Sequence, residues 1–169
     1  MRNKSILLGI ITLLIIGCKQ PQPTESYNTM TILGTYTVDI ESQKQGGDSK
    51  NDLWFEHEDK KSFYLVPKNG MRMAVVNNKN FSNISQAFIA KQPLKNKQIG
   101  KENLTVGSII LFKTGEGHYG KLQIKGYRAL HDFNFPEAQT YLDKQWRTFV
   151  SHRDNVQNYH MVVAYKLYE

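Results

Sequence analysis

Cysteine is almost absent from this chain: its 169 residues contain a single one, Cys18. One thiol cannot form an internal disulfide bond, and it cannot supply the cysteine set of a structural zinc site. The folded part of the chain must therefore be stabilised by its core. Aromatic residues, which favour strands, are plentiful for that purpose, with nine Tyr, eight Phe and two Trp.

A basic stripe is also missing. The formal charge is +7, and it falls to +5 without residues 1–17, because these carry Arg2 and Lys4 and no acid. The other Lys and Arg residues are scattered along the chain, and they do not interleave with aromatics as they do in nucleic-acid-binding proteins. No nucleic-acid partner is expected.

Familiar catalytic motifs are missing as well. Gly115 to Gly120 reads G-x-G-x-x-G, but a strand is predicted after it, where a dinucleotide-binding fold needs a helix. The kinase-like triplet His152-Arg153-Asp154 lacks the rest of its motif. No serine lies in G-x-S-x-G, and no two histidines have the i, i+4 spacing of a helical metal site. We therefore expect no catalytic set, no resident metal and no cofactor.

The N-terminus, in contrast, is distinctive. Arg2 and Lys4 precede an apolar run of 12 residues, 6–17, and the small Gly17 stands directly before Cys18. This order is typical of a secretory signal. Twelve helical residues cover about 18 Å, which is too short for a bilayer core of about 30 Å. The alternative is a short N-terminal helix with an inert, buried Cys18.

The segment Ile15-Ile16-Gly17-Cys18 resembles the lipobox of bacterial lipoproteins. The resemblance implies that residues 1–17 are a signal peptide and that Cys18 is lipidated and anchors the protein in a membrane. Several acyl chains hold far better than one, because each buried methylene contributes about 0.8 kcal/mol. Residues 18–29 would be the lipidated cysteine and a flexible tether. We expect an outer-membrane location in the bacterial cell envelope.

A single β-rich domain is predicted for residues 30–169. Strands are expected within 30–41 and at 53–56, 62–66, 71–76 and 159–168, and residues 82–89 fit either a short helix or a strand. Ser108 to Thr114 and Tyr119 to Tyr127 predict a β-hairpin. In its second arm, apolar residues alternate with Lys121, Gln123 and Lys125, which predicts that one face is wet.

One substantial helix is expected near the C-terminal end of the chain. Pro136 is typical of a first helical turn, and apolar residues follow on one stripe, which predicts a helix over about residues 136–151. The predicted fold class is therefore mainly β, an antiparallel β-sandwich or small barrel with this one helix.

Candidate ligand-binding residues are few. Trp54 is the aromatic residue best placed to stack on a ligand, because it borders a loop and a group of carboxylates. Glu56, His57 and Tyr119 are the other candidates. Glu56 and Glu58 share one face if the strand continues, which could raise the pKa of one of them. A solvated, charged turn explains the same pattern, since Lys60 and Lys61 follow directly.

Two further resemblances concern the domain. Asp52-Leu-Trp-Phe-Glu56, the Tyr64 to Gly70 segment and the 106–122 hairpin resemble a recurrent exported β-domain of bacteria that generally has no assigned activity. The hairpin alone is similar to one in the HmuY-type haem-binding lipoproteins, although no histidine here matches the haem ligands of that family.

The favoured function is a membrane-tethered, non-catalytic module that binds a carbohydrate or protein. The alternatives are haem or metal capture through histidines such as His118 or His131, and a glycan hydrolase that uses Glu56 or Glu58.

Overall fold

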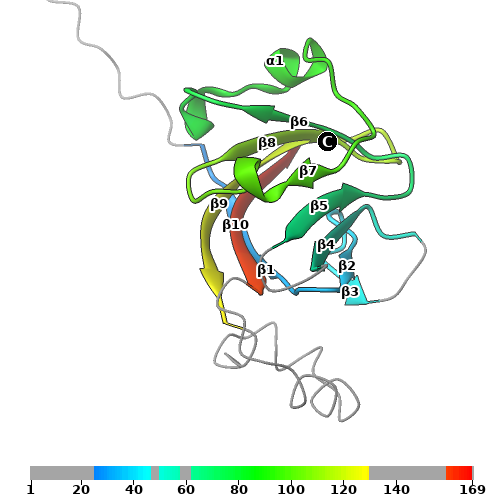
Figure 1. Cartoon of the computed structure of the whole chain (residues 1–169). Coiled ribbons are helices and arrows are strands. Elements are labelled where there is room, and N and C mark those ends of the chain that lie inside the picture. Colours follow the sequence, from blue (N-terminus) through cyan, green and yellow to red (C-terminus); the bar gives the residue numbers. More distant parts are fainter. Residues whose placement is uncertain (1–24, 47–49, 58–61, 130–158, 169) are drawn as a thin grey trace, which may run out of the picture.

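The computed structural model describes residues 25–46, 50–57, 62–129 and 159–168. Within these residues, ten strands form two antiparallel five-stranded sheets that pack against each other (Figure 1). The predicted fold class, mainly β with sandwich-like packing, is confirmed. The helix predicted at residues 136–151 lies outside the described residues.

The first sheet, sheet A, has the strand order β1-β10-β9-β8-β6. Its strands are β1 (Asn28–Ile32), β6 (Arg72–Val76), β8 (Ile109–Lys113), β9 (Tyr119–Arg128) and β10 (His160–Tyr168). Strands β8 and β9 are the predicted hairpin, with Lys113 opposite Tyr119. The last strand of the chain lies between β1 and β9, so both ends of the described chain meet in one sheet.

The second sheet, sheet B, has the strand order β3-β2-β4-β5-β7. Its strands are β2 (Thr37–Val38), β3 (Gln45–Gly46), β4 (Leu53–His57), β5 (Phe63–Pro67) and β7 (Ile99–Gly100). The turn from β5 to β6 contains Asn69 and Gly70, both with positive φ, as the Pro-Lys-Asn-Gly sequence predicts. The β-rich segment 30–41 is divided between the sheets, because the chain turns after Ile32 to cross from β1 to β2.

The core lies between the two sheets. Phe55 and Leu65 of sheet B and Ile110, Phe112 and Leu122 of sheet A are all fully buried in one apolar cluster. The period-two burial of β5 fits this arrangement, because alternate side chains of a strand point to opposite faces. The described residues therefore fill the space between the sheets with apolar side chains.

The outer face of sheet A carries a second, smaller apolar cluster. Residues 82–89, whose sequence fits either a short helix or a strand, belong to a segment with two helical pieces. These are η1 (Phe81–Asn83) and α1 (Gln86–Ala90). The Ser85 side chain caps α1 by accepting a hydrogen bond from the Phe88 backbone N–H at 3.2 Å. Apolar residues from these pieces pack on Ile109 and Leu111 of β8, namely Phe81, Ile84 and Ile89. A further helical turn, η2 (Lys101–Asn103), follows β7. No helix in the described part of the chain is long and apolar enough to cross a membrane.

The packing of η1 and α1 on the outer face of sheet A contradicts one prediction made from the sequence. Lys121 was expected on the wet face of the hairpin, yet its exposed fraction is 0%. Its Nζ donates to the carbonyl oxygens of Phe81 and Ile84, both at 2.8 Å, and to the Glu25 carboxylate. The prediction is wrong because η1 and the residue after it lie over β9 at this point, whereas Lys125, further along the strand, is exposed.

Gly120 gives a direct test of the packing between β8, β9 and β10. A Cβ at this position would lie 2.2 Å from the Phe112 ring and 2.8 Å from the Lys166 carbonyl oxygen. Gly120→Ala is therefore expected to lower the free energy of unfolding by about 3 kcal/mol, because overpacking a dense core forces side chains and backbone to shift. Urea denaturation measures this effect. Gly126→Ala on the same strand is the control, since nothing lies within 4 Å of its added Cβ. Equal effects of the two substitutions would contradict the assigned packing.

Candidate functional site

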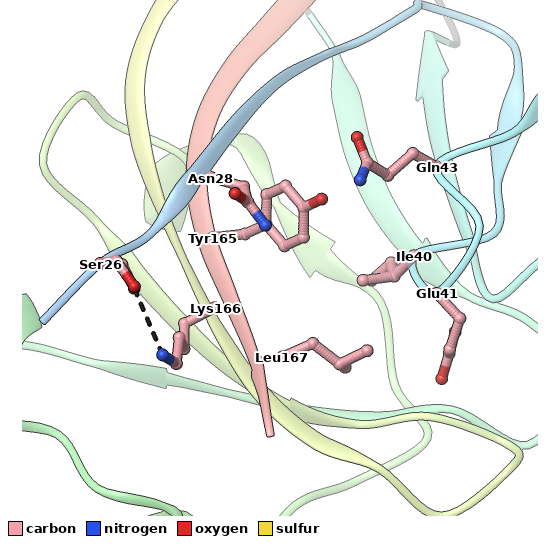
Figure 2. A pocket seen from close by; sticks show the side chains of 8 residues that line it. All are labelled: Ser26, Asn28, Ile40, Glu41, Gln43, Tyr165, Lys166 and Leu167. Atoms are coloured by element: carbon pink, nitrogen blue, oxygen red, sulfur yellow. Dashed lines mark hydrogen bonds between the residues drawn. The ribbon is translucent and has the colours of Figure 1, made fainter. Parts of the chain in front are cut away.

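A polar hollow opens where β1 and β10 of sheet A approach the turn that follows β2 (Figure 2). Its volume is about 240 Å³, and its lining residues are Ser26, Asn28, Ile40, Glu41, Gln43, Tyr165, Lys166 and Leu167. Figure 2 shows Asn28 beside Tyr165 on the sheet A side, with Gln43 and Glu41 on the opposite side. Lys166 Nζ donates to the Ser26 carbonyl oxygen at 3.3 Å. The hollow thus presents amide, carboxylate and phenol groups together, and the Lys166 ammonium lies at its edge.

Burial also affects the phenol of this hollow. It raises the pKa of Tyr165, and a hydrogen bond with Asn28 opposes the rise only in part. The phenol therefore stays protonated at neutral pH and can both donate and accept a hydrogen bond. A hydroxyl-rich ligand would find both kinds of partner here.

A group of acidic residues lies behind Glu41. His118, from the tip of the β8–β9 hairpin, places its Nδ1 3.1 Å from Glu41 Oε1. Asp52 stands just before β4, is 1% exposed, and accepts a hydrogen bond at Oδ2 from the Ile40 backbone N–H at 3.1 Å. Its other oxygen, Oδ1, has no hydrogen-bond donor. The Asp52 and Glu41 side chains also interact, since each shifts the pKa of the other.

The two carboxyl groups differ in pKa. Burial, then the hydrogen bond and negative charge of Glu41, raise the pKa of Asp52 to about 7. Burial alone would raise the pKa of Glu41, but hydrogen bonds from Thr114, Asp52 and His118 outweigh it and lower that pKa. The pair therefore holds one proton up to about neutral pH, and Asp52 carries it.

This acidic group could also hold a hard cation. Ligand oxygens of Asp39, Glu41 and Asp52 all lie within 4.8 Å of one another, which matches the spacing of oxygens around one Ca²⁺ or Mg²⁺ ion. A protonated Asp52 would weaken such binding, because metal ligands must be deprotonated. No histidine belongs to a metal-sized group among the described residues.

The four residues predicted to bind ligand do not form one site. Trp54 and Glu56 lie together on the outer face of β4, where Lys68 Nζ is 4.7 Å from the centre of the Trp54 ring. His57 lies on the opposite, core-facing side and stacks on Tyr159 with ring centres 4.6 Å apart. Tyr119 is in the other sheet, under Lys113. Glu58 lies outside the described residues, so the proposed Glu56–Glu58 pair has no geometry here.

The described histidines serve packing and hydrogen bonding. His160 is fully buried, and its Nδ1 accepts a hydrogen bond from the Gly34 backbone N–H at 3.1 Å. His57 makes edge contacts with Phe55 besides its stack on Tyr159. His118, at the hairpin tip, is partly exposed and paired with Glu41. His131 and His152 lie outside the described residues.

The acidic group was not found from the sequence. Glu41 and His118 are separated by 77 positions, and neither lies in a motif with Asp52. Nor does the sequence indicate the cluster around Lys121, whose partner Glu25 is 96 positions away. In both cases the fold, rather than local spacing, brings the groups together.

Comparisons with known proteins identify no relative: no family model, no curated protein and no solved structure matches this chain. The resemblances to exported β-domains and to HmuY-type lipoproteins therefore stay predictions.

Proposed function

We propose that this protein is a lipid-anchored component of the bacterial cell envelope, acylated at Cys18, whose β-rich domain is a non-catalytic binding module. The observation that carries the proposal is the N-terminal order of charges, a 12-residue apolar run and Gly17-Cys18. The described fold begins at Glu25, so six residues separate it from Cys18. Two prolines among them favour an extended spacer between lipid and domain.

The arrangement of the domain favours binding at its surface. Apolar side chains occupy the space between the sheets, and the hollows found among the described residues open to solvent and have polar linings. The hollow of Figure 2 is the best candidate for a carbohydrate or for a polar loop of a protein, because it combines hydrogen-bond donors and acceptors from sheet A and from the turn between β2 and β3.

The geometry also favours a non-catalytic role. Asp52 is the described carboxyl group whose pKa is raised towards neutrality, as a general acid requires, but it is 1% exposed and lies behind Glu41. A substrate in the hollow could not reach it. The two alternatives, histidine-based haem or metal capture and a hydrolase based on Glu56 and Glu58, have no supporting observation among the described residues.

Cys18→Ala tests the anchor. In a bacterial host fed labelled palmitate, the unaltered chain is expected to take up label and to sediment with membranes. The Cys18→Ala chain should take up no label, because the thioether bond to diacylglycerol needs the thiol. Thr24→Ala, in the same spacer, is the control and should behave like the unaltered chain. Equal labelling of the Cys18→Ala chain would refute acylation at this position.

A further inference from the structure

The charges of the described chain are segregated. Residues 62–101 contain seven cationic side chains and no acidic one. Acidic residues gather elsewhere: Asp39, Glu41 and Asp52 lie together, and the negative charge of Glu116 acts on Asp52. The run of cations within residues 62–101 is visible in the sequence, but the acidic group is brought together only by folding.

Two cations line one hollow on the outer face of sheet A, and three more belong to the segments beside it. Arg72 of β6 is directly opposite Lys113 of β8, and both line a hollow of about 210 Å³ with Tyr119 and residues 90 and 92–94. Lys91 belongs to the same loop, and Lys95 forms backbone hydrogen bonds with Met73 of β6. Lys79 Nζ lies 5.5 Å from the centre of the Phe88 ring on α1. We call Arg72, Lys79, Lys91, Lys95 and Lys113 the cationic face.

The cationic face is not neutralised within the described part of the chain. The ion pairs found there involve His118 with Glu41 and Lys121 with Glu25, and none of the five face residues. Arg72 and Lys113 are like charges on directly opposed positions, an arrangement that destabilises a sheet. An anionic partner would relieve this repulsion.

The chain enters the domain on this same face. Glu25 contacts Lys121 and accepts a hydrogen bond from the Tyr168 hydroxyl at 3.0 Å. Tyr27, which is 50% exposed, packs edge-on against Phe81 of η1 with ring centres 5.8 Å apart. Tyr168 is directly opposite Tyr119, the tyrosine that lines the same hollow as Arg72 and Lys113. The entry point and the hollow are therefore neighbours on the outer face of sheet A.

From these observations we infer that the cationic face rests on an anionic membrane surface, with the phosphates of the lipid headgroups as its ligands. The inference rests on the proposed anchor, because the seven steps from Cys18 to Glu25 span at most about 25 Å. An anchor of that reach keeps the entry point, and hence the cationic face, close to the headgroups. Lys and Arg near an anionic surface are attracted to it, and an exposed tyrosine suits the interface.

Vesicle sedimentation tests the inference without the anchor. The chain from residue 18 to 169 with Cys18→Ser contains every described strand and carries no lipid. We expect it to bind vesicles of phosphatidylcholine and phosphatidylglycerol, in a 3:1 ratio, at least thirty-fold better than pure phosphatidylcholine vesicles. The difference should shrink when the salt is raised, because surface charges are screened. Equal binding to both vesicles would overturn the inference.

Two matched double substitutions, each of which removes two positive charges, show which surface of the domain contacts the vesicle. Each cation near an anionic surface is worth about a five-fold change in binding, so Arg72→Gln with Lys113→Gln should weaken binding by roughly 25-fold. Lys44→Gln with Lys50→Gln removes two charges from the hollow beside the β2–β3 turn and should cost about three-fold or less. Equal losses for the two pairs would show general charge attraction without a preferred face. Circular dichroism of each variant checks that it is folded.

Orientation is measured on the acylated protein. Because Cys18 is the only cysteine, a second cysteine can be labelled at a single site once Cys18 is acylated. A fluorophore at Ala90→Cys, in the lining of the cationic hollow, should transfer energy to acceptor lipids more strongly than one at Ser42→Cys. Equal transfer would contradict the proposed orientation while leaving the anchor intact, whereas loss of palmitate labelling would refute the anchor alone.

Discussion

Lys121→Met is expected to lower the free energy of unfolding by about 3 kcal/mol, because removing this buried ammonium leaves several polar groups without a donor. Methionine has nearly the same length and keeps the apolar contacts of the side chain. It cannot donate to the Phe81 and Ile84 carbonyl oxygens or to Glu25. The attachment of the N-terminal segment to η1 should weaken with it. Urea denaturation at pH 7 measures the loss.

The pH dependence of the stability lost in Lys121→Met shows whether the loss comes from the ion pair or from packing. Burial would raise the pKa of Glu25, but hydrogen bonds from Lys121 and Tyr168 and the charges of Lys121 and Lys166 outweigh it and lower that pKa. The pair therefore stabilises the fold above about pH 4.3, the unfolded value for Glu, and this contribution is lost as pH falls below it. The difference between the variant and the unaltered chain should narrow at pH 3. Lys125→Met, at an exposed position, is the control and should change stability by about 0.5 kcal/mol or less. A loss below about 1 kcal/mol for Lys121→Met would contradict the assigned role.

Asp52→Asn is expected to remove a pH dependence of stability. The pKa of Asp52 is about 7 in the folded protein and about 3.9 in an unfolded chain, so only the folded state binds this proton between those values. The stability of the unaltered protein should therefore fall as pH rises from about 4 to 7, by about 2–4 kcal/mol in total. Asparagine can accept from the Ile40 N–H and donate to Glu41, as protonated Asp52 does. The stability of the variant should not decrease between pH 4 and 7, and the variant should be the more stable protein at pH 8.

Thermal unfolding at several pH values between 4 and 8 tests this expectation. His118, which contacts Glu41, is present in both proteins, so the comparison isolates the change at Asp52. Asp39→Asn alters a less buried member of the same acidic group, and the stability of this variant should still decrease as pH rises from about 4 to 7. If the unaltered protein and Asp52→Asn have parallel stability profiles from pH 5 to 8, the shared proton between Asp52 and Glu41 is ruled out.

The sequence predicted those parts of the fold that depend on neighbouring residues. The hairpin of β8 and β9 was found because its turn residues and its alternating arms are contiguous, and the Pro67 to Gly70 turn was found for the same reason. The crossing from β1 to β2 was missed. The stretch from Met30 to Glu41 is β-forming throughout, and only the positions of the two sheets decide where it turns.

The same limit explains the misplacement of Lys121. Alternation along β9 correctly separates two faces, but it does not reveal what covers each one. The outer face is covered by η1 and by α1, a helix of five residues that is too short to give a clear periodic pattern. The acidic group and the pairing of Arg72 with Lys113 in the cationic face depend on contacts between distant segments, so neither could be derived from spacing.

The position of β10 has a consequence for how the protein is made. This strand comprises the last described residues of the chain, yet it pairs with β1 on one side and β9 on the other. The first strand of sheet A therefore has no partner until residues 160–168 have emerged from the machinery that synthesises or exports the chain. Contacts of such large sequence separation slow folding. Completion of sheet A therefore waits for residues 160–168, which would suit the export proposed above, because an incompletely folded chain passes more easily through a narrow channel.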